Sequence, residues 1–229
     1  MSLPGMSVTV LIPAYNEAAR IGAVLAATAG HPLVDEVLVV DDGSSDGTAD
    51  AAAAVPGVTV LRQAGNGGKT RALAAGLHAA RSELIALIDA DLLGLTPDDL
   101  TRLITPVTAG AAQMSISLRG NAPPPWRWIG LDFISGERVM PKRLLAPAMA
   151  GLDTLPRFGF EVHLNRLILQ QGLPIAVVPW PGVSSPIKSR KYGLWSGIKG
   201  DVGMIADMIR TVPPFELARQ IIGLRRLRL

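Results

Sequence analysis

The first half of the chain alternates short apolar runs with longer stretches in which apolar residues recur at helical spacing. The short runs have the length and the β-branched content of strands, and the stretches between them have the period of amphipathic helices. Strands are predicted at residues 8–12, 37–40, 58–61 and 84–88, each followed by a helix. Because strand and helix alternate, the pattern predicts an α/β fold with a mostly parallel central sheet flanked by helices.

The second half of the chain has a less regular pattern. Strands are predicted at 113–118 and 175–178, and helices at 158–171, from 195 and from about 215. Residues 119–128 contain three consecutive prolines and two tryptophans and are predicted to form an extended loop. Polar residues and prolines therefore interrupt the predicted helices and strands more often in this half than in the first. The sequence contains no internal repeat.

Charge is concentrated at the end of the chain. Residues 1–187 have a formal balance of −3, and residues 188–229 a balance of +6. We divide the chain into a main domain at 1–193 and a basic, amphipathic helical appendage at 194–229. Such a segment, with Trp195 and an arginine-rich end, suits an anionic membrane surface, although packing on the sheet or a dimer contact are alternatives. We expect no nucleic-acid partner.

Composition excludes several classes of protein. The chain has no cysteine, so neither disulfides nor a zinc–thiolate site can form. No run of about 18 apolar residues is present, and the first residues do not read as a signal peptide. We expect a cytoplasmic protein, which could associate peripherally with the inner face of the membrane.

The apolar run at 84–88 ends abruptly in Asp89-Ala90-Asp91. In an open α/β sheet, ligands bind at the carboxyl ends of the strands, where these two acids are expected to lie. Residues two apart in an extended chain point the same way, so both carboxylates can converge on one cation. Their hard oxygen ligands suit Mg²⁺ or Mn²⁺, whereas an ordinary turn is the simpler alternative for one such pair.

Polar residues also follow the other predicted strands. Asn16, Asp41, Asp42 and Lys69 all lie in or near loops at strand ends, with Asn16 as a plausible helix cap. In a parallel sheet these loops gather at one edge, so we expect the polar side chains to form a single site.

Two common nucleotide-binding motifs do not fit. A phosphate-binding loop ending in Gly68-Lys69-Thr70 would require glycine at position 63, where the chain has Gln63. The segment after the first strand, residues 13–17, contains no glycine, which argues against a dinucleotide fold and hydride transfer.

Four motifs in order resemble family 2 glycosyltransferases with the GT-A fold. They are Pro13-Ala14-Tyr15-Asn16-Glu17, residues 40–48 (Val-Asp-Asp-Gly-Ser-Ser-Asp-Gly-Thr), Asn66-Gly67-Gly68-Lys69 and Asp89-Ala90-Asp91. The resemblance covers roughly residues 7–195. Residues 159–161 (Gly-Phe-Glu) and 188–191 (Lys-Ser-Arg-Lys) are most similar to the dolichyl- or polyprenyl-phosphate sugar synthases of that family.

The resemblance implies metal-dependent, inverting transfer of one sugar from a nucleoside-diphosphate sugar, either a UDP- or a GDP-sugar. It implies a nucleotide-sugar site formed by Pro13, Tyr15, Glu17, Asp41, Asp42, Lys69, Asp89 and Asp91. Asp89 and Asp91 would hold Mg²⁺ or Mn²⁺, which neutralises the leaving diphosphate as a Lewis acid, and Asp91 would be a catalytic residue.

Basic residues are candidates for the diphosphate and the acceptor. Lys188, Arg190 and Lys191 could close over the diphosphate oxygens and exclude water, and a solvated basic loop is the alternative. Arg138 could pair with an acceptor phosphate, or simply be a solvated arginine.

Glu161 is the second catalytic candidate, as general base for a hydroxyl acceptor, whereas an ionised polyprenyl phosphate needs no base. The expected acceptor is a polyprenyl phosphate or another membrane-associated molecule. Transfer to a small soluble hydroxyl acceptor, with Glu161 as base, is the alternative within the same chemistry.

A sugar-phosphate nucleotidyltransferase fits less well because the loop after the first strand lacks glycines and basic residues. A non-catalytic nucleotide-binding or membrane scaffold is the alternative of another class.

Overall fold

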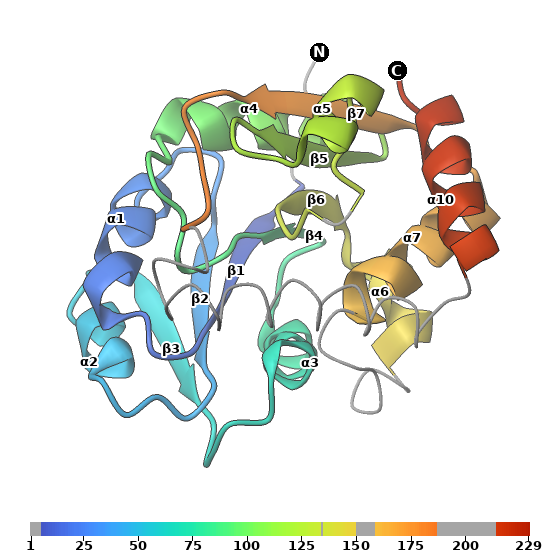
Figure 1. Ribbon diagram of the computed structural model, residues 1–229. Helices are drawn as coiled ribbons and strands as arrows, with labels where there is room; N and C mark the ends of the chain where they lie inside the picture. The colour runs from blue at the N-terminus through green and yellow to red at the C-terminus, as the bar shows by residue number, and fades with distance from the viewer. Residues whose placement is uncertain (1–5, 134, 150–158, 187–213) are drawn as a thin grey trace.

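The computed structural model of the chain describes residues 6–133, 135–149, 159–186 and 214–229. Its centre is a seven-stranded sheet in the order β3-β2-β1-β4-β6-β5-β7 (Figure 1). The strands are β1 (Val8–Ala14), β2 (Glu36–Asp41), β3 (Val58–Arg62), β4 (Leu84–Leu87), β5 (Met114–Arg119), β6 (Arg138–Pro141) and β7 (Ile175–Trp180). All paired neighbours run parallel except β6, which is antiparallel to both β4 and β5.

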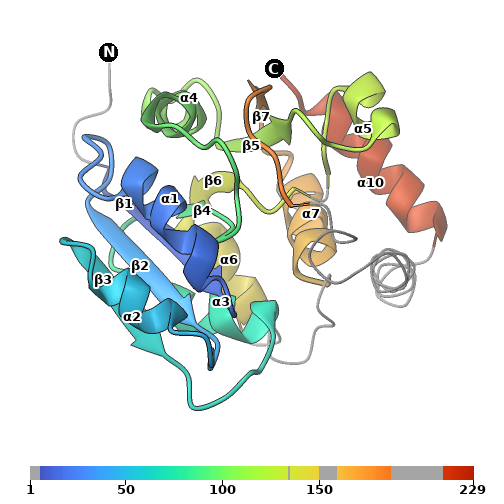
Figure 2. The ribbon, with the colours of Figure 1, turned by 60° about the vertical axis from the view of Figure 1, so that its left-hand side comes forward.

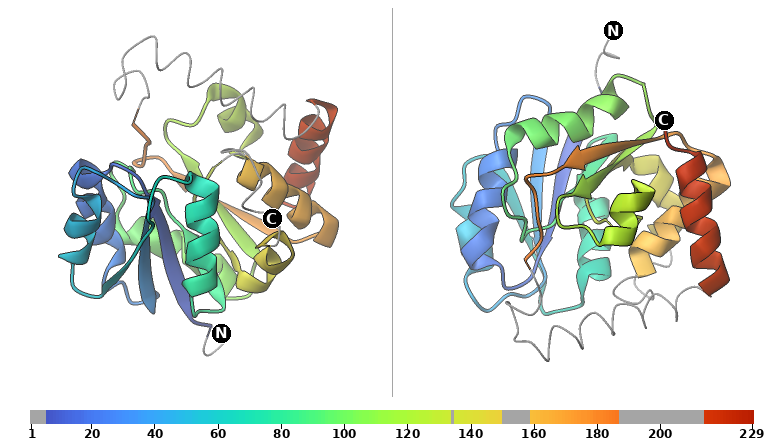
Figure 3. Two further views of the ribbon diagram at one scale, coloured as in Figure 1. Left: turned by 90° about the horizontal axis from the view of Figure 1, so that it is seen from below. Right: turned by 45° about the horizontal axis from the view of Figure 1, so that its top comes forward.

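Helices cover both faces of this sheet. They are α1 (Ala18–Thr28), α2 (Thr48–Ala53), α3 (Lys69–Ala79), α4 (Pro97–Thr108), α5 (Pro124–Ile129), α6 (Lys142–Met149), α7 (Gly159–Gln171) and α10 (Pro214–Arg226). α1, α2 and α4 share one hydrophobic core with the sheet, and α3, α6, α7 and α10 share the other (Figures 1 and 3). Two cores form because successive side chains of a strand point to opposite faces of the sheet. In β1, Val10 and Ile12 belong to the first core, and Leu11 belongs to the second.

The predicted α/β class, the mostly parallel sheet and the predicted strands and helices of the described residues are confirmed. The start of α4 is a capping box, in which Thr96 accepts from the Asp99 amide (3.2 Å) and Asp99 accepts from the Thr96 amide (3.1 Å). Pro97 follows at the first helical position, as expected. The helix predicted from 195 begins outside the described residues. The helix predicted from about 215 corresponds to α10.

Three features differ from the sequence prediction, one of which is helix α6, where no element was predicted. The segment predicted as an extended loop at 119–128 contains α5, because proline fits the first turn of a helix, where an amide donor is not required. Strand β6 was not predicted. It has only four residues and begins with Arg138, so it carries no long apolar run, and its pairing with β4 and β5 is a tertiary effect.

The end of the chain packs on the main fold. In α10, Leu224 is buried in the core shared with α7, and Gln220 donates to the Val162 carbonyl. The Ile175 amide donates to Leu227, which extends the contact to β7. The predicted boundary at 193/194 lies outside the described residues and stays a prediction. Within the described part of the chain, no helix is long and apolar enough to cross a bilayer.

Candidate donor-binding site

A pocket of about 230 Å³ lies where β1, β2 and β4 end. Its lining consists of Pro13, Ala14, Tyr15, Glu17, Asp42, Lys69, Ala72, Asp89, Ala90 and Asp91. The lining includes all of Asp89-Ala90-Asp91, most of the 13–17 motif, and one residue, Asp42 or Lys69, from each of the other two motifs. The expected gathering of polar loops at one edge of the sheet is therefore observed. The acidic pairs 41/42 and 89/91 therefore contribute to the same pocket through Asp42, Asp89 and Asp91.

A larger cavity, of about 640 Å³, lies at the opposite end of the strands. It is lined by residues such as Met6 and Leu84 at the starts of β1 and β4, and by Arg81, Lys142 and Arg143. Glu83 is the one acidic residue in its lining. The motifs therefore single out the smaller pocket as the candidate site.

The loop after β1 is held by the loop after β2. The Asn16 amide donates to Ser44 (2.9 Å), the Ser45 amide donates to the Asn16 side chain (3.0 Å), and the Glu17 amide donates to Thr48 (2.8 Å). Asn16 is thus not the helix cap that the sequence suggested: α1 begins after Glu17, and the Asn16 side chain ties two loops together. This contact fixes the backbone from Pro13 to Glu17 at the pocket.

Asp41 and Asp42 have different environments at the end of β2. The Asp42 carboxylate accepts from the Gly67 amide (2.9 Å) and the Gly68 amide (2.7 Å), so it shapes the glycine loop before α3 while lining the pocket. Asp41 is buried like Asp42 but is not part of the pocket lining. Its Oδ2 accepts from the Ser44 amide, and its Oδ1 has no hydrogen-bond partner within the described residues.

Gly43 allows the loop after β2 to contact the glycine loop before α3. It has a φ of +73°, in the left-handed region that favours glycine, and a Cβ at this position would lie 2.7 Å from the Gly65 backbone. A side chain at position 43 would therefore separate the loop after β2 from the glycine loop that Asp42 holds.

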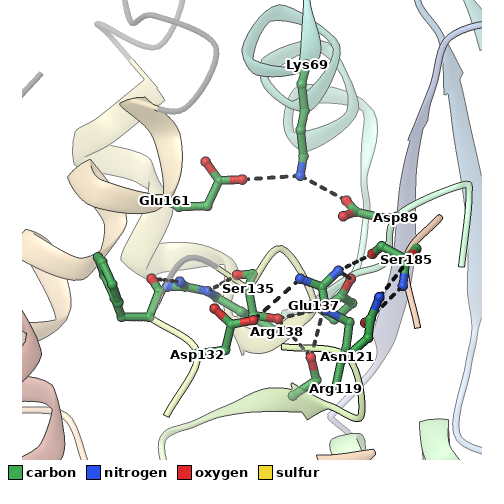
Figure 4. A network of polar contacts seen from close by, with 12 residues as sticks. Lys69, Asp89, Arg119, Asn121, Asp132, Ser135, Glu137, Arg138, Glu161 and Ser185 are labelled. Atoms are coloured by element: carbon green, nitrogen blue, oxygen red, sulfur yellow. Dashed lines mark hydrogen bonds and ion pairs between the residues drawn. The ribbon is translucent and has the colours of Figure 1, made fainter. Parts of the chain in front are cut away.

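Lys69, the first residue of α3, connects two carboxylates across the pocket. Its Nζ lies 2.9 Å from Asp89 Oδ1 and 3.2 Å from Glu161 Oε1 (Figure 4). Burial by itself would lower the pKa of Lys69, but the charges of Asp89 and Glu161 raise it overall. Burial would raise the pKa of Asp89, yet the Lys69 charge holds it below its usual value. Glu161, in the first turn of α7, has an Oε2 that is buried without a partner among the described residues.

The loop before β6 reaches this ion pair. A Cβ on Gly136 would lie 2.9 Å from both Lys69 Nζ and Asp89 Oδ1, so the backbone there passes directly against the pair. Glu137 follows and is fully buried. Burial raises its pKa, and the Asp89 charge adds to the increase, while Arg119 opposes it.

A buried polar cluster that the sequence did not reveal supports this loop. Glu137 accepts from Ser117 (2.8 Å) and Ser135 (2.6 Å), and Arg119 forms ion pairs with Glu137 (3.3 Å) and Asp132 (3.4 Å). These contacts lie beside Asp89 in the structure (Figure 4). One signal was available, since polar residues alternate along the otherwise buried strand β5, a pattern that places them on one face.

The sequence suggested that Arg138 pairs with an acceptor phosphate or is solvated, and the structure shows neither environment. Only 1% of the residue is exposed, and the guanidinium donates to the Ser135 carbonyl (2.8 Å), the Phe133 carbonyl (2.7 Å) and Asn165 (2.7 Å). Burial lowers its pKa to about 10, against the opposing effect of nearby carboxylates. We therefore correct the expectation: Arg138 is neither solvated nor directed at the pocket, because its donors are used within the fold.

The carboxylates at 89 and 91 fit a divalent ion that also binds substrate. Within the described residues, no cluster of three or more acidic, histidine or cysteine side chains could hold a metal alone. Mg²⁺ commonly takes one or two protein carboxylates and completes its shell with water and phosphate oxygens. Asp89 and Asp91 at the pocket wall suit that arrangement, in which a diphosphate supplies the remaining oxygens.

The predicted basic residues Lys188, Arg190 and Lys191 lie outside the described residues, as does Trp195. The segment just before them is described. Ser184 and Leu93 exchange backbone hydrogen bonds (2.9 and 3.0 Å), and the Ser185 amide donates to Asn121. Because Leu93 comes two residues after Asp91, the chain that leads to the basic residues starts beside the pocket.

Comparisons with known proteins agree with this geometry. The model of a family described as glycosyl transferase family 2 matches residues 9–155. Among curated relatives, undecaprenyl-phosphate 4-deoxy-4-formamido-L-arabinose transferase of Serratia proteamaculans is 38% identical over 110 residues, which are 44% of this chain and 33% of that protein. Glucosyl-3-phosphoglycerate synthase of Mycolicibacterium smegmatis is 33% identical over 111 residues, or 45% of this chain and 37% of the relative. The chain thus spans about a third of their length.

Solved structures similar to this chain include a glucosyl-3-phosphoglycerate synthase from another organism. Glucosyl-3-phosphoglycerate synthase from Mycobacterium tuberculosis, in complex with Mn²⁺, UDP and glucosyl-3-phosphoglycerate, has a TM-score of 0.69 and 25% identity. The match covers 90% of this chain and 80% of the synthase. A complex of that synthase with Mg²⁺ and UDP matches with a TM-score of 0.68 and the same identity. Both complexes contain a divalent ion together with a uridine nucleotide.

Proposed function

The chain belongs to glycosyltransferase family 2, and on that premise we propose that it transfers one sugar, with inversion, from a nucleoside-diphosphate sugar. The observation that carries this proposal is the shared pocket of Asp42, Lys69, Asp89 and Asp91 at the ends of β1, β2 and β4. An acid pair for a cation and an adjacent lysine suit a diphosphate, whose charge must be neutralised before it can leave.

We propose a UDP-sugar as the donor, with Mn²⁺ or Mg²⁺ bound through Asp89 and Asp91. The mycobacterial synthase binds these ions with UDP, and the two carboxylates here supply the oxygen ligands that such ions need. The metal would stabilise the departing diphosphate as a Lewis acid. The residues 13–17 and Asp41 would hold the nucleoside, and the orphaned buried Oδ1 of Asp41 is an acceptor suited to a base or ribose donor.

The predicted basic residues would act on the same diphosphate. Lys188 follows Ser185 by three residues, and three residues of extended chain span about 11 Å at most. Ser185 is bonded to Asn121, and the preceding Ser184 pairs with Leu93, two residues after Asp91 of the pocket. We propose that Lys188, Arg190 and Lys191 contact the diphosphate oxygens from this side.

We propose a polyprenyl phosphate as the acceptor. A phosphate oxygen would attack the anomeric carbon while the bond to the donor diphosphate breaks, and the electron pair leaves with the diphosphate. Because the phosphate is already an anion, no base is required. This chemistry suits Glu161, which is 5% exposed and paired with Lys69 rather than open to solvent. One relative of the chain acts on undecaprenyl phosphate according to its name.

The second candidate acceptor is a small phosphorylated hydroxy acid. It is favoured by the match to the synthase whose complexes contain phosphoglyceric acid or its glucosyl product. In this case a hydroxyl must lose its proton as it attacks. Glu161 would be the base, because it pairs with Lys69 of the pocket and its Oε2 has no hydrogen-bond partner among the described residues.

A thermal-shift screen tests the donor. UDP or a UDP-sugar with Mn²⁺ is expected to raise the melting temperature by about 5–10 °C at a concentration near 100 times Kd, because binding to the folded state adds about 2.7 kcal/mol. GDP with Mn²⁺ and UDP with a chelator are the controls, and each should give a smaller shift. No shift with any nucleotide and metal would overturn the proposed donor site.

Glu161→Gln distinguishes the two acceptors. The amide keeps a hydrogen-bonding oxygen for Lys69 but cannot accept a proton, so transfer to polyprenyl phosphate should fall less than about tenfold. Transfer to a hydroxyl acceptor should instead fall by about 10²–10⁴-fold. Glu83→Gln, at an exposed position beside the opposite cavity, is the matched control. A large loss with polyprenyl phosphate would contradict the first candidate.

A further inference from the structure

Large apolar side chains are exposed on α5 and α10. Trp128 of α5 is 92% exposed, and Phe215 and Ile222 of α10 are 73% and 55% exposed. Leu229, at the end of the chain, is also exposed. Apart from these, the exposed large hydrophobic residues of the described chain are Tyr15 in the donor pocket and Leu93 beside it. Most of the exposed large hydrophobic residues of the described chain thus lie on α5, on α10 or at the end of the chain. Exposed apolar side chains that gather in one region are typical of interaction surfaces.

The exposed residues of α10 lie on one side of the helix. Phe215 and Ile222 are seven residues apart and therefore share a face, whereas Gln220 and Leu224 on the other side are buried. That buried side is closely packed on α7, since a Cβ on Gly223 would lie 2.6 Å from Leu169. The helix is thus held in place by one face, and the other face is not covered by any other described part of the chain. Helix α5 lies near the carboxyl end of α10 (Figures 2 and 3), where Arg228 donates to Gly130 just after α5 (3.1 Å).

Arginines flank the apolar residues. Arg219, Arg225 and Arg226 on α10 and Arg127 on α5 are all exposed, and none of them forms an ion pair with an acidic side chain of the described residues. The one acidic residue of α10, Glu216, is paired with Arg166 at 3.6 Å. The surface therefore combines apolar side chains with an uncompensated positive charge.

A groove runs between α7 and α10 on this surface. It measures about 480 Å³ and is lined by Leu169, Phe215, Ala218, Arg219, Ile222, Gly223 and Arg226. Its volume falls in the range of about 300–1,000 Å³ that ligand sites occupy. Apolar walls bounded by two arginines can accept hydrocarbon while the guanidinium groups meet anionic headgroups, because long basic side chains keep their charge at the polar level.

We propose that the exposed face of α5 and α10 docks on an anionic lipid bilayer, with Phe215, Ile222 and Trp128 in the interface and the arginines on lipid phosphates. A second copy of the chain is disfavoured, because a two-fold contact through this face would place arginine against arginine. The inference rests on the proposed function, in that a polyprenyl-phosphate acceptor is embedded in a membrane. The surface would bring the transferase to it.

Vesicle flotation of the full chain tests this surface. The wild type should float with vesicles of phosphatidylcholine and phosphatidylglycerol, much less with phosphatidylcholine alone, and less at high salt. Each arginine near an anionic surface contributes about fivefold to partitioning, so Arg225→Glu/Arg226→Glu should weaken binding at least ~25-fold. Phe215→Ser/Ile222→Ser should also release the protein.

Arg81→Glu/Arg143→Glu is the matched control, since it makes the same change of charge at exposed residues of the opposite cavity. It should retain most of the binding. Equal losses in the control, or no flotation of the wild type, would overturn the proposed surface. So would a wild-type dimer, measured by light scattering, that Phe215→Ser/Ile222→Ser dissociates. The UDP–Mn²⁺ thermal shift of each variant separates the two proposals, because a docking failure with an intact shift leaves the transferase proposal standing.

Discussion

Asp91→Asn is expected to reduce sugar transfer by about 10²–10³-fold, the usual effect of removing one group that stabilises transition-state charge. Asp91 lines the donor pocket two residues beyond Asp89, at the end of β4. The amide retains the shape of the side chain but removes a negative charge that a divalent ion needs. We expect the loss mainly in kcat and a shift of the Mn²⁺ requirement to higher concentrations, measured by initial rates at several metal concentrations.

Asp98→Asn is the matched control for this variant. Asp98 is exposed in the first turn of α4, where an acidic charge near the helix terminus contributes about 0.3–1 kcal/mol to stability. Transfer by this control should remain at the wild-type rate. If Asp91→Asn retained full activity and an unchanged metal requirement, the assignment of the metal to the 89/91 pair would be wrong.

Lys69→Met is expected to lower both stability and donor affinity. Lys69 joins Asp89 and Glu161, so its removal leaves two carboxylates in the pocket without their shared cation. Leaving a buried acceptor without its partner costs about 1–3 kcal/mol, which corresponds to a decrease of about 2–12 °C in melting temperature for a chain of this size. The UDP–Mn²⁺ thermal shift should also decrease, because the lysine beside the diphosphate is lost.

The pH dependence of this deficit follows from the two pKa shifts. The pKa of Lys69 is raised, so its contribution is present below its usual value and is lost only as the pH rises through the folded value, above about 10. The pKa of Asp89 is lowered, so its contribution is present above about pH 4 and is lost as the pH falls through the folded value. The deficit of Lys69→Met should therefore be constant between about pH 5 and 9 and shrink in stronger acid.

Lys142→Met provides the comparison. Lys142 donates to the Ala80 carbonyl beside the opposite cavity and pairs with no described carboxylate. It should melt close to the wild type and bind the donor normally. A Lys69→Met protein with the melting temperature and donor affinity of this control would show that the contacts of Lys69 contribute little.

The apolar pattern was sufficient to predict most of the sheet. Buried parallel strands read as short apolar runs, and β1, β2 and β4 all end in polar motifs that the sequence shows directly. Asp42, Lys69, Asp89 and Asp91 could be placed together for this reason alone. Parallel strands end at one edge, so residues distant in the chain meet without any knowledge of side-chain packing.

The surroundings of Asp89 could not be predicted in the same way. Strand β6 is short, starts with a charged residue and inserts antiparallel between β4 and β5. Only this insertion brings Gly136 and Glu137 against the Lys69–Asp89 pair. Arg138 shows the same limit, because an arginine in a polar segment gives no sign that backbone carbonyls and Asn165 will bury it.

By itself, the sequence determined the fold class, the family and the meeting of Asp42, Lys69, Asp89 and Asp91 at one edge of the sheet, because these depend on local periodicity and on motifs at strand ends. The tertiary structure decided which charges face one another. Lys69 and Glu161 are 92 residues apart and meet only because α3 and α7 pack on the same face of the sheet. The exposed face of α10 was decided in the same way, since the packing of its other face on α7 leaves Phe215 and Ile222 outside the core.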